Sequence, residues 1–366
     1  MKGFLTLIPT LLFTFAASAQ LTFPADGGNK KASVGEDIGL THVTVHYDRP
    51  AVKGREGKIW GQLVPVGYAP NPGFGTVTKM PWRAGANENT TITFSTDVTI
   101  EGKKLAAGTY GFFIAYDPKE CTLIFSKDNE AWGSFFYNEN NDALRVNVKP
   151  LSINESMERL TYSFNGQTDS SAVLALIWEK LRIPFTISTE LQKLQLASID
   201  REMNTAKGFS ASSFYEVANY YLEHNIMLDK ALTYIDAAAR SMPVFNTFAI
   251  KAEIEEKLGK TKEAAESMKK AVAATNSVSQ AHYYGRQLLG TNNQKAFEIL
   301  KMNYDHYPNV YTTNMGMARA YSAVGNYKEA LKFATKALPQ SPDANNKTAV
   351  EKGIAALKEG KDINTL

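Results

Sequence analysis

Four alanines recur in the second half of the chain at a nearly constant interval. Ala231, Ala264, Ala296 and Ala330 are separated by 33, 32 and 34 residues. Two helices cross closely only where small side chains lie at the crossing, so alanine at this period is typical of stacked helical hairpins. One hairpin cannot bury its own apolar face but a stack can, so this half of the chain is constrained to form an array.

Prolines keep the same phase and mark the ends of the units. Pro243, Pro308 and Pro342 follow three of the copies, and Asn276 stands in that position in the second copy. Proline ends a helix because it cannot continue the hydrogen-bond ladder. The clearest copy runs from Tyr311 to Pro342, with Ala318, Tyr321, Gly325, Tyr327, Ala330 and Ala337 between them. This pattern resembles the tetratricopeptide repeat (TPR) family over about residues 210–342.

The repeat predicts the organisation of the second half. Residues 189–208 are expected to form a connecting helix, residues 209–342 about four TPR-type hairpins, and residues 343–366 a polar capping helix and tail. Asn219 and Tyr284 stand where the first helices of copies one and three should carry a small residue. A close crossing is therefore not expected in those two copies.

The first helix of each TPR-type hairpin lines the groove of the array. By register, this groove is expected to include Glu216, Tyr220, Glu223, Glu253, Glu256, Met315 and Arg319. A mixed, mainly acidic groove suits an extended peptide or a partner helix. The alternative is that these residues only form a solvated face.

The first half alternates apolar and polar residues with a period of two. Val43, Val45 and Tyr47 share one side of a strand that starts near Leu40. The stretch 90–100 predicts a second strand, and further strands are expected at 110–116, 122–126, 144–148, 160–164, 172–178 and 181–187. Short antiparallel strands without interleaved helices favour a β-sandwich or barrel. The whole chain is therefore expected to be an α+β multidomain protein, with the β-rich domain at residues 20–188.

Five separate motifs carry a family resemblance in this half. They are Lys-Ala-Ser-Val-Gly at 31–35, Asp-Arg-Pro-Ala-Val-Lys-Gly-Arg at 48–55, Trp-Arg-Ala-Gly-Ala-Asn-Glu-Asn-Thr-Thr at 82–91, Lys-Leu-Ala-Ala-Gly-Thr-Tyr-Gly at 104–111 and Trp-Glu-Lys-Leu at 178–181. Together they resemble DUF2911, a domain of exported proteins found mainly in the Bacteroidetes lineage, over about residues 23–187. The resemblance implies export and the presence of helical repeats, and it supplies no catalytic residues.

The segment before the second strand holds the candidate catalytic residues. Arg83 and Glu88 could hold a polar ligand, with Glu88 as an acid or base if it is desolvated, and Asn87 lies between them. His46 and Asp48 could join them through folding. The alternative is a structural turn in which Asn87 bonds to the backbone and Arg83 pairs with an acid.

Other reactive residues have simpler explanations. His42 and His46 would stand about 13 Å apart on a strand, too far for one zinc ion with bonds of about 2.1 Å. Cys121, the only cysteine, lies in an apolar strand pattern that predicts a buried thiol. A carbohydrate platform at Trp60, Trp82, Trp132 or Trp178 is less favoured than core packing. No metal and no cofactor is expected.

The N-terminus reads as a secretory signal. Lys2 precedes an apolar run from Phe4 to Ala17, and Ala17-Ser18-Ala19 is a cleavage site before Gln20. The run is shorter than the about 20 residues that span a bilayer, so residues 1–19 are expected to be removed and the protein to be periplasmic or extracellular. The formal charge of +3, without a basic stripe, argues against nucleic acid as a partner. We therefore expect an exported binding or scaffold protein; the alternative is an envelope hydrolase with an acid/base site near Glu88.

Overall fold

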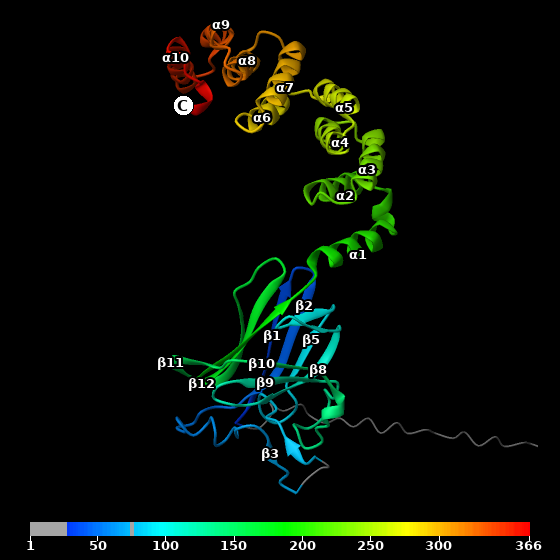
Figure 1. Ribbon diagram of the computed structural model, residues 1–366, viewed down its shortest axis with the longest axis vertical. Helices are drawn as coiled ribbons and strands as arrows, with labels where there is room; N and C mark the ends of the chain where they lie inside the picture. The colour runs from blue at the N-terminus through cyan, green and yellow to red at the C-terminus, as the bar shows by residue number, and fades with distance from the viewer. Residues whose placement is uncertain (1–27, 74–76) are drawn as a thin grey trace, which may run out of the picture. The chain divides into compact units, whose positions relative to one another are not determined.

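The computed structural model describes residues 28–73 and 77–366 (Figure 1). Its contacts divide the chain into two compact units, residues 1–195 and 196–366, with the boundary inside helix α1 (Leu191–Met203). The expected signal peptide lies outside the described residues. No helix in the described part is long and apolar enough to cross a membrane.

The first unit contains a six-stranded antiparallel sheet. Its strand order is β1 (Lys30–Ile38), β2 (Thr41–Arg49), β5 (Thr91–Phe94), β8 (Gly108–Ala115), β9 (Cys121–Ser126) and β10 (Asp142–Val148). Along β2 the side chains of Val43, Val45 and Tyr47 are buried, whereas His42 and His46 are exposed. The period-two pattern therefore sets which face of the strand meets the core.

A second antiparallel sheet faces the first across the main apolar core. Its order is β11 (Leu151–Asn165), β12 (Ser171–Ser188), β6 (Val98–Ile100) and β7 (Lys103–Leu105), and a small hairpin pairs β3 (Ala69–Pro70) with β4 (Lys79–Met80). Both sheets contribute to one core, which includes Phe94, Phe112, Phe125, Trp178 and Phe185. The expected antiparallel sandwich-like domain is confirmed.

Several strands differ from the sequence prediction. The stretch 90–100 is two strands in different sheets, because the chain crosses between sheets at residues 95–97, where the backbone N–H of Ser95 donates to His42 O at 3.0 Å. The segments 172–178 and 181–187 form one strand, β12, which is irregular at Glu179, a residue with φ of +51°. Strand β1 was not predicted, because its alternation is mostly between polar residues.

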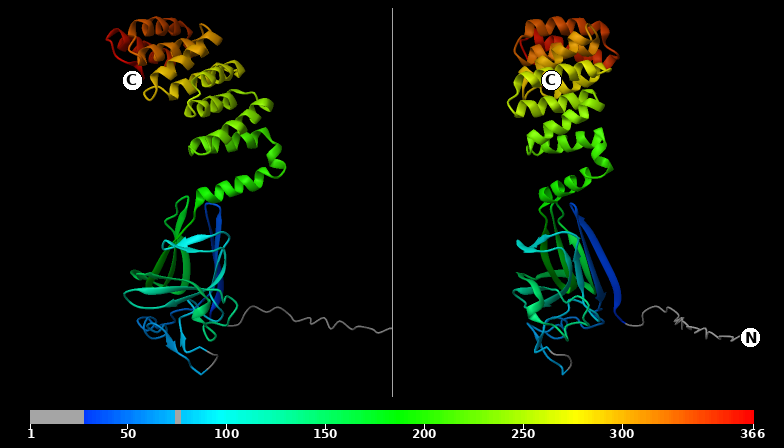
Figure 2. Two further views of the ribbon diagram at one scale, coloured as in Figure 1. Left: turned by 45° about the vertical axis from the view of Figure 1, so that its right-hand side comes forward. Right: turned by 90° about the vertical axis from the view of Figure 1, so that its right-hand side faces the viewer.

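The second unit is a succession of helix pairs (Figure 2). The hairpins are α2 (Ala211–Glu223) with α3 (Leu228–Ser241), α4 (Phe245–Lys257) with α5 (Thr261–Ala274), α6 (Val278–Gln287) with α7 (Asn293–His306), and α8 (Tyr311–Ala323) with α9 (Tyr327–Ala337). Helix α10 (Ala344–Lys358) and the short turn η4 (Ile363–Thr365) follow. Within this unit, α2, α4, α6 and α8 lie on the inner side of the curve (Figure 1).

Three of the four repeated alanines are buried between helices, as the spacing predicts, whereas Ala264 is partly exposed and lines a cavity. Ala231, Ala296 and Ala330 have no exposed surface. In copies one and three a small residue next to the expected position lies at the crossing instead. Ala218 is fully buried beside Asn219, and a Cβ on Gly285 would lie 2.8 Å from Leu300 Cγ of α7. A shift of one residue therefore preserves close packing in both copies.

Tyr284 has a different role from the one that its position suggested. Its hydroxyl donates to Glu253 of α4, and its ring meets the edge of Phe245 at 5.8 Å. Helices α4 and α6 pack together less than α2 and α4 or α6 and α8 do. Tyr284 therefore links the second and third hairpins at a point where the array is more open.

Candidate functional site

The turn from Arg83 to Glu88 has two residues in the left-handed region. Ala84 has φ of +50° and Asn87 has φ of +53°. The Arg83 guanidinium donates to Asn87 O and lies 5.3 Å from the centre of the Phe135 ring. Burial lowers the pKa of Arg83. Arg83 thus contacts a carbonyl and a ring, and not the acid that the structural interpretation supposed.

Asn87 connects this turn to the end of β2. Its Nδ2 donates to Asp48 Oδ1 at 3.3 Å, and its Oδ1 accepts from Asn29 Nδ2 at 3.2 Å. Asp48 is only 5% exposed. Lys31, opposite Asp48 in the β1–β2 register, forms an ion pair with Glu88. The structure therefore brings Asp48, Asn87 and Glu88 together.

Among the described residues, His46 makes no hydrogen bond or ion pair with this group. It lies exposed in the middle of β2, opposite Ser33 of β1 and Thr91 of β5. His42 is bound to Asp37, with Nδ1 to Oδ1 at 2.7 Å. In the described part of the chain, no three His, Cys, Asp or Glu side chains are grouped as metal ligands would be.

These contacts define what the turn can do. The Glu88 carboxylate is half exposed and engaged by Lys31, so water screens its charge. Asp48 and Asn87 are bound to each other at the base of the turn. The geometry supports anchoring of the turn on β1 and β2 better than acid–base chemistry, which needs a desolvated carboxyl beside a ligand. Lys31 had no signal in the sequence, since only strand pairing places it here.

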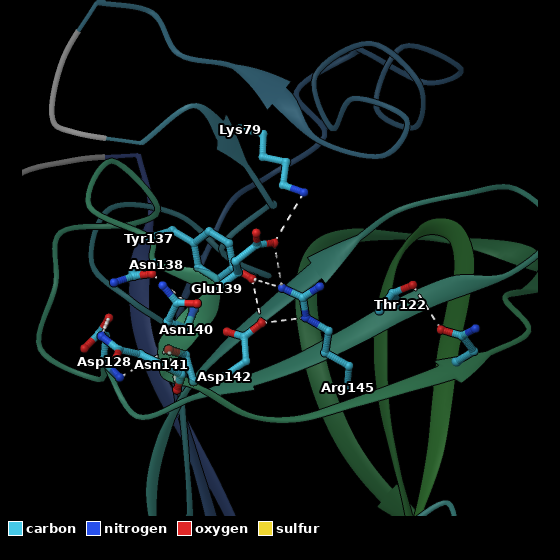
Figure 3. A network of polar contacts seen from close by, with 12 residues as sticks. Lys79, Thr122, Asp128, Tyr137, Asn138, Glu139, Asn140, Asn141, Asp142 and Arg145 are labelled. Atoms are coloured by element: carbon cyan, nitrogen blue, oxygen red, sulfur yellow. Dashed lines mark hydrogen bonds and ion pairs between the residues drawn. The ribbon is translucent and has the colours of Figure 1, made fainter.

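A second polar network, not foreseen from the sequence, fastens the β3–β4 hairpin to the six-stranded sheet (Figure 3). Arg145 Nε donates to Asp142 Oδ2 at 2.6 Å, and the hydroxyl of Tyr137 donates to the same oxygen at 2.7 Å. Glu139 accepts from Arg145 at 3.5 Å and from Lys79 of β4 at 3.3 Å. Charges from three chain segments are thus paired at one place.

Burial makes this network a structural element. Tyr137 is 7% exposed and packs with Val77, Phe113 and Ile124. Burial, followed by its bond to Asp142, raises the pKa of Tyr137 well above its usual range. The remaining carboxylate oxygen of Asp142 is buried without a hydrogen-bond partner among the described residues. Removal of a member would leave polar groups unpaired, which is costly in a buried position.

Three of the four tryptophans pack together rather than form an open platform. Trp60 lies 5.5 Å from Trp82 and 6.0 Å from Trp178, measured between ring centres. Trp178 is 1% exposed, whereas Trp132 is 56% exposed. The packing gives no support to a carbohydrate platform made by Trp60, Trp82 and Trp178. Cys121 is fully buried, and burial raises the pKa of its thiol to about 11.

The residues expected in the groove differ in their accessibility. Glu216, Glu223 and Glu256 are exposed, and Tyr220, Glu253 and Arg319 are half-buried. The prediction that Met315 lines the groove is wrong. Its side chain is only 9% exposed and packs with Ala337 and Val350, so it belongs to the core. Its helix α8 packs against α6, α7, α9 and the turn η4, which leaves little of its surface in contact with solvent.

A cavity of about 260 Å³ lies where the second and third hairpins part. Met268 of α5 and Ile299 and Met302 of α7 supply apolar walls. The ion pair between Glu256 of α4 and Lys295 of α7 bounds it on the polar side. Glu256 therefore connects the second and third hairpins through its ion pair with Lys295.

Comparisons with known proteins match parts of the chain. Residues 29–187 match the model of DUF2911, a protein family of unknown function, which confirms the resemblance of the first half. Among solved structures the chain is similar to YrrB, a TPR protein with an unusual peptide-binding site (20% identity over 44% of this chain and 83% of that chain, TM-score 0.27). It is also similar to MamA (15% identity over 41% of this chain and 92% of that chain, TM-score 0.27). A third similar structure is a TPR protein of Thermus thermophilus (18% identity over 45% of this chain and 91% of that chain, TM-score 0.26). No curated protein matches it.

Proposed function

We propose that this chain, a DUF2911 domain followed by TPR-type hairpins, is a binding or scaffold protein whose helical array holds a protein or peptide partner. The observation that carries the proposal is the set of accessible side chains on the inner helices. Glu216 and Glu223 of α2 are exposed, and Tyr220 between them is half-buried. Successive first helices can present such side chains along one continuous surface, as an extended peptide or a partner helix requires.

The proposed location is the bacterial cell envelope. The charged, apolar and small-residue regions of residues 1–19 support export. Mass spectrometry of the protein from an expressing bacterium should find a mature chain that begins at Gln20 in the envelope or medium fraction. A chain that retains residues 1–19 and stays in the cytoplasm would contradict export.

The partner surface can be tested by site-specific crosslinking. A photo-reactive amino acid would replace Glu216 on α2 and, as a matched control, Lys230 on the neighbouring helix α3; both residues are exposed. We expect discrete adducts with an envelope protein from the α2 position and few from the α3 position. A truncation after residue 205 should abolish them. Equal crosslinking from both helices, or retention of every partner by the truncated chain, would overturn the proposal.

The hydrolase alternative receives no support from the observed contacts. Glu88 is exposed and paired with Lys31, and Arg83 is bound to Asn87 O and stacked on Phe135. Arg83 and Glu88 therefore contact different groups. We therefore propose no ligand for the β-domain.

A further inference from the structure

The two main sheets of the β-domain have four edge strands, and three of these contact another segment along their edge. On β11, Leu160 N donates to Pro50 O at 3.0 Å. Strands β7 and β10 lie beside each other, and Lys103 Nζ donates to Arg145 O at 3.3 Å. Strand β1 is nine residues long and, among the described residues, makes no backbone hydrogen bond outside its ladder with β2. The outer side of β1 is therefore available to another strand (Figure 2).

The ladder with β2 determines which backbone groups of β1 point outward. In an antiparallel ladder, the residues of a strand point their backbone groups alternately to one side and to the other. On β2, His42 O accepts from Ser95 N at 3.0 Å, on the side away from β1. Because His42 stands opposite Asp37, the backbone groups of Asp37 also point away from the ladder. The residues of β1 that present N–H and C=O groups outward are Lys31, Ser33, Gly35 and Asp37.

The charges of β1 have opposite signs at its two ends. Lys30 and Lys31 begin the strand, and Glu36 and Asp37 lie near its end. The side chains of Lys31 and Asp37 are 61% and 75% exposed. A second, antiparallel copy of the strand would place each basic end beside an acidic end, whereas a parallel copy would place like charges together. Strand β1 is thus complementary to itself in the antiparallel direction.

One register satisfies the backbone and the charges together. Hydrogen-bonded pairs across the new interface must join residues that both point outward. With Val34 on the two-fold axis, Lys31 stands opposite Asp37 of the second copy and Ser33 stands opposite Gly35. Moving the axis to Ser33 or to Gly35 keeps the backbone bonds but places Lys31 opposite a glycine. The register centred on Val34 therefore forms two ion pairs that the neighbouring registers lack.

We propose that β1 is the interface of a symmetric homodimer, in which the six-stranded sheets of two copies join edge to edge. Val34 is partly buried against the main core, so its copy across the axis would cover apolar surface that now meets solvent. Lys31 can bind Asp37 of the second copy while it keeps Glu88, because an ammonium has three donors. Asp37 binds His42 through Oδ1, which leaves Oδ2 for this contact.

This inference goes beyond the partner surface of the helical array and does not depend on it. A dimer would carry two helical arrays. A partner with two matching sites would therefore be held more tightly by the dimer than by a single copy.

Sedimentation equilibrium of the purified chain over a range of concentrations tests the association, and we expect a monomer–dimer equilibrium. K31E and D37K each place like charges across the interface twice, so each should raise the Kd of the dimer at least about tenfold. The double variant K31E/D37K restores opposite charges and should recover most of the association. The control K119E changes an exposed lysine between β8 and β9 and should leave the Kd unchanged.

Cysteine substitution locates the two-fold axis. V34C would face its own copy in a non-hydrogen-bonded pair, where Cα atoms lie about 4.5 Å apart, within reach of a disulfide. The native Cys121 is fully buried, so it should not compete. Mild oxidation should therefore convert V34C to a covalent dimer. The matched control S33C should crosslink far more slowly, since the two copies of Ser33 would lie two residues out of register.

Three results would each overturn the dimer interface. They are a chain that stays monomeric at every concentration, a dimer whose Kd is unchanged by K31E and by D37K, and faster crosslinking of S33C than of V34C. None of them affects crosslinking from Glu216 on α2, so the two proposals fail separately.

Discussion

The guanidinium of Arg83 lies directly against the backbone of Gly133. A Cβ at this glycine would fall 2.1 Å from Arg83 Cζ, and the residue has φ of +61°. Glycine is thus required both for its backbone conformation and for the space that Arg83 occupies. The turn at 83–88 and the loop after β9 are joined by this contact and by the ring of Phe135.

We predict that G133A lowers the free energy of unfolding of the β-domain by about 2–4 kcal/mol, since it adds a clash to an unfavourable φ. Denaturant unfolding followed by tryptophan fluorescence measures the change. The control is G54A: Gly54 has φ of +69° but nothing within 4 Å of its Cβ position. It should cost only about 1–2 kcal/mol. Equal losses in the two variants would show that Arg83 does not constrain Gly133.

The crossing of α6 and α7 gives a second prediction. G285A should destabilise the helical unit by about 1–3 kcal/mol, because its Cβ would lie 2.8 Å from the fully buried Leu300. G353A in α10 has its nearest neighbour at 3.6 Å and should instead gain about 0.5–1 kcal/mol from helix propensity. Circular dichroism at increasing urea concentration compares the two. Stabilisation by G285A would contradict the close crossing.

Cys121 is expected to be unreactive in the folded protein. Burial raises the pKa of its thiol to about 11, and the side chain has no exposed surface, so neither the thiolate nor access is available at neutral pH. The rate of alkylation by iodoacetamide at pH 8 should rise at least about a hundredfold when urea unfolds the β-domain. Rapid labelling in native buffer would show that this strand opens readily.

His282 should make the helical unit sensitive to acid. The pKa of His282 is lowered to about 4 in the folded chain, below its value of about 6.5 when unfolded. Its contribution is therefore complete above pH 6.5 and is lost as the pH falls towards 4, by as much as about 3 kcal/mol. H282Q should unfold with a smaller dependence on pH in this interval. The exposed His42 is the control: H42Q should leave the dependence unchanged.

The repeat in the second half could be predicted because close helix packing selects small residues at a fixed spacing, although Ala264 of the second copy is partly exposed. Ala231, Ala296 and Ala330 are buried at the spacing read from the sequence. The departures at Asn219 and Tyr284 did not open the crossings, since Ala218 and Gly285 lie one residue away. A helix can rotate slightly and present a neighbouring residue, and spacing alone does not show this adjustment.

The β-domain shows the limit of alternation as a signal. It predicts which residues of β2 face the core, but not which strands pair or where a chain changes sheet. The contact of Lys31 with Glu88 and that of Lys79 with Glu139 join segments about 60 residues apart. Such contacts follow from strand register and loop geometry, and no local motif records them.

The open junction between α4 and α6 has a mechanical consequence. In a linear array, stability is the sum of each unit and its contact with the next, so the weakest contact decides where the array divides. Here the array should divide into two blocks, the first two hairpins and the last two, which are connected by Tyr284, Lys295 and an apolar cluster that includes Phe245 and Ile299. A ligand that binds both blocks across the junction would make them unfold together, as one cooperative unit.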